Sequence, residues 1–444
     1  MSVKRIVCLL VCLVLALPVL AAAEESGWTP AAASEKAFNH LLNKEYGAVY
    51  EMITPSVQAL VTAEAIGQAW QSALDSLGSF ERVAQVAEAE QSGLQIVQYL
   101  VAQTGGQTVV TFGYGSDRLL AALTIQPVTQ FVTETPLPVP EGAAEEAVAL
   151  RAGQADETRG ALTLPAGEGP YPAVILVQGS GASDMDESIM GIKPFRDLAM
   201  GLAAKGIASL RYDKYTYAHP DLFAGDPTVD KEYLADIRSA VQLLAADGRI
   251  GRIYIAGHSL GGILVPRLLQ ASEGLADGGI ILAGSSRPLW EIQWMQNEDA
   301  LATLQGEQLK QGRAIVDAEL EKARRLLDMS PEELAAETVF GLSAAYQADL
   351  ARDNPADIAK ELGLPLLILQ GEKDWQVKAE EDFAAWQKAL EGTAFAAFKL
   401  YPGLSHVFIA LPGESAGNVS DYANGGHVDQ AVIDDIAAWI FAQN

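Results

Sequence analysis

The sequence predicts an α/β protein with a doubly wound, mostly parallel sheet and a helical cap insertion, preceded by a small α+β domain. Buried strands and amphipathic helices alternate over the second two thirds of the 444 residues, which is typical of a parallel sheet with helices on both faces. One long helical stretch interrupts this alternation. A Pro-rich segment separates this alternating part of the chain from an N-terminal part with a different hydrophobic pattern.

Residues 1–23 are expected to be a secretory signal peptide. Two basic residues precede an apolar run, and an A-x-A cleavage site ends at Ala23. The alternative is a membrane anchor, which Pro18 and the small residues at the end of the run disfavour. Cleavage would leave a secreted or extracytoplasmic protein without a membrane attachment.

The composition describes a globular protein without thiol chemistry. Hydrophobic residues make up 49% of the chain and charged residues 20%, which excludes an intrinsically disordered protein. Both cysteines, Cys8 and Cys12, lie in the expected signal peptide, so the mature chain would have none. A net charge of -27 argues against nucleic acid or an anionic membrane as a partner.

Residues 24–130 are predicted to form the small α+β domain. Apolar residues recur at helical spacing over residues 28–77, and from Phe80 the period changes to two. Four segments of this period, separated by QSG, TGG and similar turns, predict successive antiparallel strands. His40, the one histidine of this part, is expected to be a surface or core residue. The sequence does not indicate a partner for this domain.

A Pro-rich linker, residues 131–144, leads into the second domain, residues 145–444. A predicted hairpin opens the domain, and the alternation of strands and helices follows it. The helical cap, at about residues 287–362, is expected over the carboxyl ends of the strands, where open α/β sheets bind ligands. Strands are predicted at residues 173–177, 207–212, 252–256, 279–283, 365–369 and 396–401, and helices at 194–204, 233–246 and 263–269.

The stretch RIYIAGHSLGGIL places a serine between glycines where a strand is predicted to turn into a helix. It contains G-x-S-x-G, a pattern in which a strained turn exposes the serine hydroxyl above the edge of a sheet. Gly257 and Gly261 would leave room for the crossing backbones, with Ser259 at the apex. The alternative is a Gly-rich turn with a capping serine, so the role of Ser259 depends on its partners.

A nucleophilic serine needs a base, and the base needs an orienting carboxylate. His406 follows the last predicted strand, in LYPGLSHVFI, whereas His258 adjoins the serine and is expected to point elsewhere. Asp374 follows the preceding strand, in LLILQGEKDWQV, with Glu372 as the weaker candidate. The chain order Ser259, Asp374, His406 is the order of a triad in an α/β-hydrolase sheet.

Acyl transfer also needs backbone donors for an oxyanion. Leu260 N–H follows the serine at a helix N-terminus, where the helix dipole favours negative charge. The stretch VILVQGSGAS supplies a Gly-rich loop after an earlier strand, and Ser180 N–H, between Gly179 and Gly181, is the best second donor. With the triad, these donors predict a serine hydrolase.

Residues 145–444 resemble the secreted bacterial α/β-hydrolases of the dienelactone-hydrolase and serine-aminopeptidase-like group. The resemblance lies in VQGSGASDMDE, KPFRDLA, GIASLRYDKYT, GHSLGG, LQGEKDWQV and LYPGLSH. The part before the linker is similar to a small uncharacterised, cystatin-like domain that often precedes such hydrolases. The resemblance implies hydrolysis of carboxylic esters through an acyl-enzyme, with no metal or other cofactor. Gln178 departs from the pattern, because relatives usually have histidine there.

The acidic run after the Gly-rich loop has two interpretations. Asp184, Asp186 and Glu187 could bind a metal ion, but the basic residues of RYDKY, Arg211 and Lys214, favour a network of ion pairs. We therefore expect no metal site there.

Aromatic residues of the cap are expected to pack in a core, although a substrate-facing role for some of them stays open. His427, ahead of the last helix, is expected to be structural or to cap that helix. The aromatic residues in question are Trp290, Trp294, Phe340 and Tyr346.

The expected function is a secreted serine hydrolase that cleaves esters of short to medium acyl chains. One alternative is an amide hydrolase of the serine aminopeptidase or prolyl peptidase kind, for which an acidic pair in the cap, Glu332 and Glu333, is a weak indication. An alternative of another class is a catalytically inert module that binds a surface polymer. The intact set of triad residues argues against the inert module.

Overall fold

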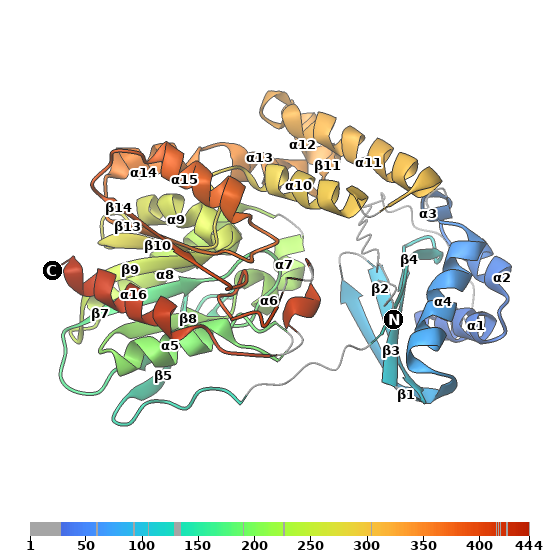
Figure 1. Cartoon of the computed structure of the whole chain (residues 1–444), viewed down its shortest axis with the longest axis horizontal. Helices are drawn as coiled ribbons and strands as arrows, with labels where there is room; N and C mark the ends of the chain where they lie inside the picture. Colours follow the sequence, from blue (N-terminus) through green and yellow to red (C-terminus); the bar gives the residue numbers. More distant parts are fainter. Residues whose placement is uncertain are drawn as a thin grey trace. The chain divides into compact units, whose positions relative to one another are not determined.

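The computed structural model of the chain divides into two compact units, residues 1–130 and 131–444 (Figure 1). The expected signal peptide and residues 131–134 of the expected linker lie outside the described residues. In the part that is described, no helix is both long and apolar enough to cross a membrane. The structure describes residues 28–58, 61–91, 94–104, 106–127, 135–189, 191–224, 227–302, 304–413, 415, 417, 419–422 and 425–443.

The first unit packs helices against one face of an antiparallel sheet. Its elements are α1 (Pro30–Leu42), α2 (Tyr46–Glu51), α3 (Pro55–Gln58), α4 (Ala63–Leu77), β1 (Phe80–Gln91), β2 (Leu94–Gln103), β3 (Gly106–Tyr114) and β4 (Leu120–Pro127). The strands pair in the order β1-β2-β3-β4, each antiparallel to the next. The predicted meander is confirmed.

Aromatic rings form the centre of this unit's core. Phe38 of α1 meets Trp70 of α4 and Tyr99 of β2 edge to face, with ring centroids 5.9 and 5.1 Å apart. Tyr99 also meets Phe112 of β3, at 5.6 Å. The period of two in the strands therefore turns one face of the sheet toward the helices.

The second unit is built on a sheet of eight strands. Its elements up to the cap are β5 (Ala144–Leu150), β6 (Thr158–Leu164), β7 (Tyr171–Val177), α5 (Pro194–Ala204), β8 (Ala208–Tyr212), α6 (Tyr215–Ala218), α7 (Pro220–Ala224), the π-helix η1 (Asp230–Leu234), α8 (Ala235–Ala246), β9 (Ile250–His258), α9 (Leu260–Ala271) and β10 (Gly278–Leu282). The remaining elements are α10 (Leu289–Ala302), α11 (Gly306–Arg324), η2 (Leu326–Asp328), α12 (Pro331–Ala336), β11 (Thr338–Val339), β12 (Leu342–Ser343), α13 (Ala344–Ala351), α14 (Pro355–Leu362), β13 (Leu366–Gly371), the π-helix η3 (Ala379–Phe383), α15 (Ala384–Ala389), β14 (Ala396–Tyr401), η4 (Val419–Tyr422) and α16 (Gln430–Ala442).

The strand order β14-β13-β10-β9-β7-β8-β6-β5 is that of a mostly parallel sheet with an antiparallel edge. The six strands from β14 to β8 run parallel. The hairpin β5–β6 joins antiparallel to β8. This is the predicted α/β class, including the predicted opening hairpin.

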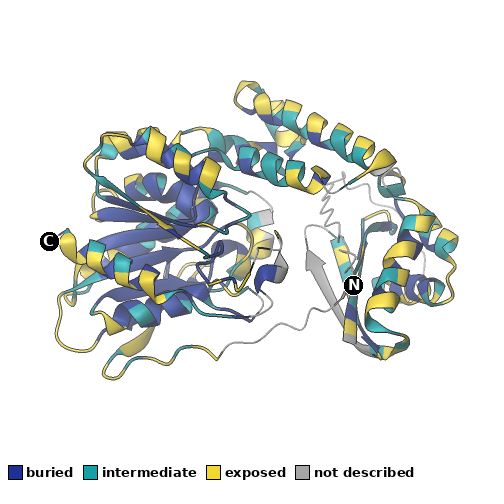
Figure 2. Ribbon diagram, viewed as in Figure 1, coloured by how far each residue is buried: buried dark blue, intermediate teal, exposed yellow. Residues whose placement is uncertain are grey.

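Helices cover both faces of this sheet (Figure 1). Along β7, Ile175 and Val177 face the cluster that contains α8 and α9, whereas Val174 and Leu176 face the cluster that contains α5 and α16. The central strands are therefore buried on both sides, as Figure 2 shows, and their sequences are continuously apolar rather than alternating.

The cap contains its own small core. α10 to α13 and the two-stranded β11–β12 ribbon lie between β10 and β13 in the chain. Val339, Ala344 and Leu326 are buried there, with Trp290 and Phe340 packed against them. The last helix of the predicted insertion, α14, instead shares the core beside the sheet with α9, so it belongs to the helix layer of the sheet.

Candidate active site

Ser259 lies at a very tight turn between β9 and α9. Its backbone has φ 53° and ψ -116°, in a region that L-residues other than glycine rarely adopt. A Cβ on Gly257 would lie 2.2 Å from the carbonyl oxygen of Gly261, and one on Gly261 would lie 2.6 Å from that of Gln178. Both glycines are therefore required for the crossing of the backbones, as predicted, and Ser259 is half-buried at the apex.

The carboxylate of Asp374 is hydrogen-bonded to His406. The loop after β13 carries Asp374 and the loop after β14 carries His406, and the distance from Asp374 Oδ2 to His406 Nδ1 is 2.6 Å. Three further donors fix the buried carboxylate: the backbone N–H groups of Gln376 and Val377, at 2.8 and 2.9 Å, and the side-chain amide of Gln370, at 2.8 Å. A carboxylate held on Nδ1–H leaves His406 Nε2 as the basic nitrogen.

The second carboxylate of this loop, Glu372, takes no part in this arrangement. It is exposed and accepts the backbone N–H of Gly403 at 3.0 Å. Asp374 is thus the partner of His406, in line with the preference predicted from the sequence. Gln370, the last-but-one residue of β13, was not predicted, because a buried amide inside a strand carries no motif.

His258 bridges three loops and is not available as a base. Its Nδ1 lies 3.0 Å from Glu187 Oε1 and its Nε2 lies 3.0 Å from the carbonyl oxygen of His406. Both partners are hydrogen-bond acceptors, so both ring nitrogens carry protons. Burial lowers the pKa of His258, but the charge and the hydrogen bond of Glu187 outweigh burial, and the pKa is raised. The expectation that His258 points elsewhere is confirmed.

The Gly-rich loop after β7 packs directly on the serine. A Cβ on Gly179 would lie 3.0 Å from that of Ser259. Gly179 N–H is donated to Glu187 at 2.7 Å, whereas Ser180 N–H meets no acceptor among the described residues. Leu260 is the first residue of α9, where the N–H groups lack partners within the helix. Gly179, which precedes the predicted donor Ser180, thus packs on Ser259, and the predicted donor Leu260 follows Ser259 in the chain.

His258, which precedes Ser259 in the chain, lies next to His406: the two ring centroids are 4.5 Å apart. The Ser259 hydroxyl and the His406 ring are not hydrogen-bonded to each other among the described contacts. Bonds of this kind are commonly long in enzymes without substrate and shorten when it binds.

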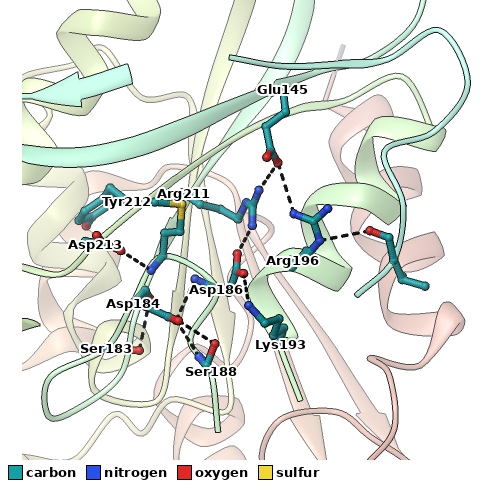
Figure 3. A network of polar contacts seen from close by, with 12 residues as sticks. Glu145, Ser183, Asp184, Asp186, Ser188, Lys193, Arg196, Arg211, Tyr212 and Asp213 are labelled. Atoms are coloured by element: carbon teal, nitrogen blue, oxygen red, sulfur yellow. Dashed lines mark hydrogen bonds and ion pairs between the residues drawn. The ribbon is translucent and has the colours of Figure 1, made fainter. Parts of the chain in front are cut away.

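The acidic run after the Gly-rich loop forms ion pairs (Figure 3). Asp186 accepts from Arg211 and, at 2.9 Å, from Lys193. Asp184 accepts the N–H and the hydroxyl of Ser188. In the described part of the chain, no group of three or more His, Cys, Asp or Glu side chains could hold a metal ion. The predicted pairing of Arg211 with this run is confirmed.

The predicted pairing of Lys214 with the acidic run is wrong. Lys214 Nζ lies 2.5 Å from Glu232 Oε1 of η1. Glu187 is also no member of the ion pairs of Arg211, since its carboxylate faces Gly179 and His258.

Gln178, at the position where relatives usually have histidine, forms hydrogen bonds through its side-chain amide. Its Nε2 donates to the carbonyl oxygens of Tyr212 and, at 3.3 Å, of Asp184. The departure from the family pattern therefore still ties the Gly-rich loop to the end of β8.

Tyr346 and His427 are structural residues. Tyr346 is buried, donates its hydroxyl to Glu232 and meets Phe223 edge to face at 6.0 Å. His427 lies 3.0 Å from Asp197 of α5, while Asp429 caps α16. His427 therefore ties two helices of one face together and does not itself cap the helix.

The chain is similar to known esterases. Residues 191–410 match the family described as serine aminopeptidase, S33, and residues 34–123 match a protein family of unknown function, DUF3887. Esterase EstD from Thermotoga maritima is 33% identical over 405 residues, 90% of this chain and 93% of that protein.

Solved structures to which the chain is similar are more distant in sequence. Est1E from Butyrivibrio proteoclasticus has a TM-score of 0.44 and 18% identity over 66% of this chain and 99% of its own. A dienelactone hydrolase from Anabaena variabilis has a TM-score of 0.40 and 16% identity over 68% of this chain and 99% of its own. From the family match and the relationship to EstD, the chain belongs to the α/β-hydrolase family, with a catalytic part of the serine aminopeptidase S33 type after a DUF3887 part, and is an esterase.

Proposed function

We propose that the chain hydrolyses carboxylic esters of short to medium acyl chains with the triad Ser259, Asp374 and His406, through an acyl-enzyme. The observation that carries this proposal is the hydrogen bond between Asp374 and His406, at 2.6 Å, in a loop that His258 links to the turn of Ser259.

The reaction has two steps. His406 Nε2 takes the proton of the Ser259 hydroxyl while Oγ attacks the ester carbonyl carbon, and Asp374 holds the imidazolium. The N–H groups of Ser180 and Leu260 receive the oxyanion. The tetrahedral intermediate then expels the alcohol, which takes the proton from His406. A water molecule, deprotonated by His406, releases the acid from Ser259 by the same route.

An aminopeptidase activity, which the name of the matching family suggests, has less support. Such an enzyme needs a carboxylate that holds the substrate ammonium. Glu333 is already engaged: it forms a capping box with Ser330 at the start of α12 and pairs with Arg325 at 3.2 Å. An inert binding module is disfavoured by the oriented Asp374–His406 pair, and labelling of Ser259 by a fluorophosphonate would exclude it.

The secreted location and the domain limits complete the proposal. We propose that residues 1–23 are removed on export, that residues 24–130 fold as a cystatin-like domain, and that the linker 131–144 joins it to the catalytic domain 145–444. N-terminal sequencing of the exported protein tests the first point, and Glu24 is the expected first residue.

The test is hydrolysis of p-nitrophenyl esters from acetate to laurate, by the unchanged chain beside Ser259→Ala. We expect the substitution to lower kcat by at least about 10⁴-fold with little change in Tm, since the side chain lost is small and half-buried. Ser330→Ala, which removes only a helix cap in the cap insertion, is the matched control and should retain activity. An active Ser259→Ala protein would overturn the proposal, and the optimal acyl length reports the depth of the site.

A further inference from the structure

We propose that Lys214 is a positioning residue of the esterase, whose ammonium group holds the carbonyl oxygen of the Gly179–Ser180 peptide bond and so directs Ser180 N–H toward the oxyanion. The inference rests on the proposed function, because it gives a role to a residue that acts through the proposed oxyanion donor. The sequence indicated only an ion pair for this lysine.

The ammonium of Lys214 is buried and surrounded by oxygen atoms. Its Nζ donates to the carbonyl oxygens of Gly179 and Gly181, at 2.6 and 2.9 Å, and to the hydroxyl of Tyr233 at 2.7 Å. It also pairs with Glu232, and the Lys214 side chain is 1% exposed. Two of its four partners thus belong to the loop that packs on the nucleophile.

The geometry of the Gly179–Ser180 peptide bond determines the direction in which Ser180 N–H points. The Gly179–Ser180 bond is trans, so its C=O and N–H point in opposite directions. Lys214 and the hydroxyl of Tyr233, at 2.9 Å, both hold the Gly179 oxygen. The Ser180 N–H must therefore face away from Lys214, and on that side the described residues offer it no acceptor.

The neighbouring peptide cannot replace this donor. Gly179 N–H is already donated to Glu187 at 2.7 Å, and the backbone of Gly179 lies against Ser259. Of these two N–H groups, that of Ser180 is thus the one that meets no acceptor among the described residues. A cation on the carbonyl side also polarises the peptide and strengthens its N–H as a donor.

Glu232 is the acidic partner of the buried Lys214 ammonium. Burial lowers the pKa of Lys214, and the carboxylate of Glu232 opposes that effect only in part. Glu232 in turn accepts the hydroxyl of Tyr346. The π-helix η1 brings Glu232 and Tyr233, adjacent in sequence, to the same ammonium, and π-helical turns are common at functional sites.

The experiment compares Lys214→Met with Arg151→Met, which removes another buried cation that pairs with Asp236 at 3.0 Å and does not contact the Gly-rich loop. We expect Lys214→Met to lower kcat for p-nitrophenyl acetate on the order of 100-fold, with KM changed by less than about threefold. The inhibition constant of a trifluoromethyl ketone, whose adduct carries the oxyanion, should rise by a similar factor. Arg151→Met should lower Tm without these losses.

If Lys214→Met does not fold, a second pair of variants tests the inference. Tyr233→Phe removes one donor from the Gly179 oxygen and should lower kcat about fivefold. Thr216→Val removes a donor, at 3.2 Å, from the Gly181 oxygen. That oxygen belongs to a different peptide bond, so this substitution should leave kcat unchanged.

Two results overturn the inference. One is a folded Lys214→Met or Tyr233→Phe protein that keeps the kcat and ketone affinity of the unchanged chain. The other is an equal loss in the matched control. These two results count only if the unchanged chain shows hydrolysis that depends on Ser259. If the unchanged chain shows no such hydrolysis, the proposed function is refuted instead.

Discussion

Glu187 adopts a left-handed backbone conformation, with φ 51°, and its buried carboxylate serves two loops. One oxygen accepts Gly179 N–H of the Gly-rich loop and Nδ1–H of His258, and His258 passes the connection on to the carbonyl group of His406. A backbone strain of this size is kept only where contacts require it. We infer that the pair of Glu187 and His258 sets the distance between the loops of the oxyanion donor and the base.

The protonation of His258 predicts a pH-dependent stability. Because its pKa is raised in the folded chain, its contribution to stability is complete below the unfolded value of about 6.5 and is lost as the pH rises through the folded value. Glu187→Gln removes the charge but keeps an oxygen for Gly179 N–H. The resulting loss in the free energy of unfolding should be larger at about pH 5.5 than at about pH 9, as measured by urea unfolding. A loss that grows with pH would contradict this.

The four donors on Asp374 make it the carboxylate on which His406 depends. Asp374→Asn would place an amide N–H against Nδ1 and favour the wrong tautomer, so kcat should fall by about 10⁴-fold. Glu372→Gln, two residues away, should keep kcat within about twofold. Steady-state kinetics with p-nitrophenyl acetate measure both, and equal effects would refute the assignment.

At the scale of elements, the tightest constraint is the crossing of α9 over the end of β7. A methyl group on Gly261 would lie 2.6 Å from two carbonyl oxygens, those of Val177 and Gln178, and neither can move without shifting the strand. Gly261→Ala should therefore lower the free energy of unfolding by about 3 kcal/mol and abolish ester hydrolysis.

Gly248→Ala is the control for this substitution. Gly248 is exposed in the turn before β9, and a Cβ there would meet no atom within 4 Å. The change should stay within about 0.5 kcal/mol and leave the activity intact. Thermal and urea unfolding of the two variants side by side give the comparison, and a Gly261→Ala protein as stable as Gly248→Ala would contradict the crossing.

The elements that could be predicted are those with a strong local pattern. α5 and β14 have the predicted bounds, since apolar spacing and Pro194 mark the helix and an extended apolar segment marks the strand. β9 is longer than the predicted residues 252–256, because Ile250 and His258 pair with strands that the local sequence does not reveal. The helix predicted from residue 233 begins as η1 at Asp230, because a widened turn has no signature in apolar spacing.

The same limit explains what could be predicted of the site. The turn of Ser259 and the loops of Asp374 and His406 follow strands, so chain order was enough to place them. Glu187 and His258 are 71 residues apart, and their contact depends on how two loops meet in space. The predicted partner of Lys214 was wrong for the same reason, since charge alone does not distinguish the acidic run from Glu232.

At the scale of the whole molecule, the two units have separate hydrophobic cores. The core of the first contains Phe38, Trp70 and Tyr99. The two largest clusters of the second flank its sheet, and together they hold the elements that carry Ser259, Asp374 and His406. Each unit therefore has the means to fold as a domain of its own.

A chain of residues 135–444 is accordingly expected to fold and to hydrolyse a small ester. It keeps the carbonyl group of Leu137, which accepts Arg196 Nε at 3.2 Å, and every described residue of the candidate site. Its kcat/KM for p-nitrophenyl acetate should lie within about threefold of that of the longer chain, and Ser259→Ala in the short chain serves as the blank. A short chain that unfolds cooperatively but hydrolyses more than about tenfold more slowly would mean that the first unit takes part in building the site.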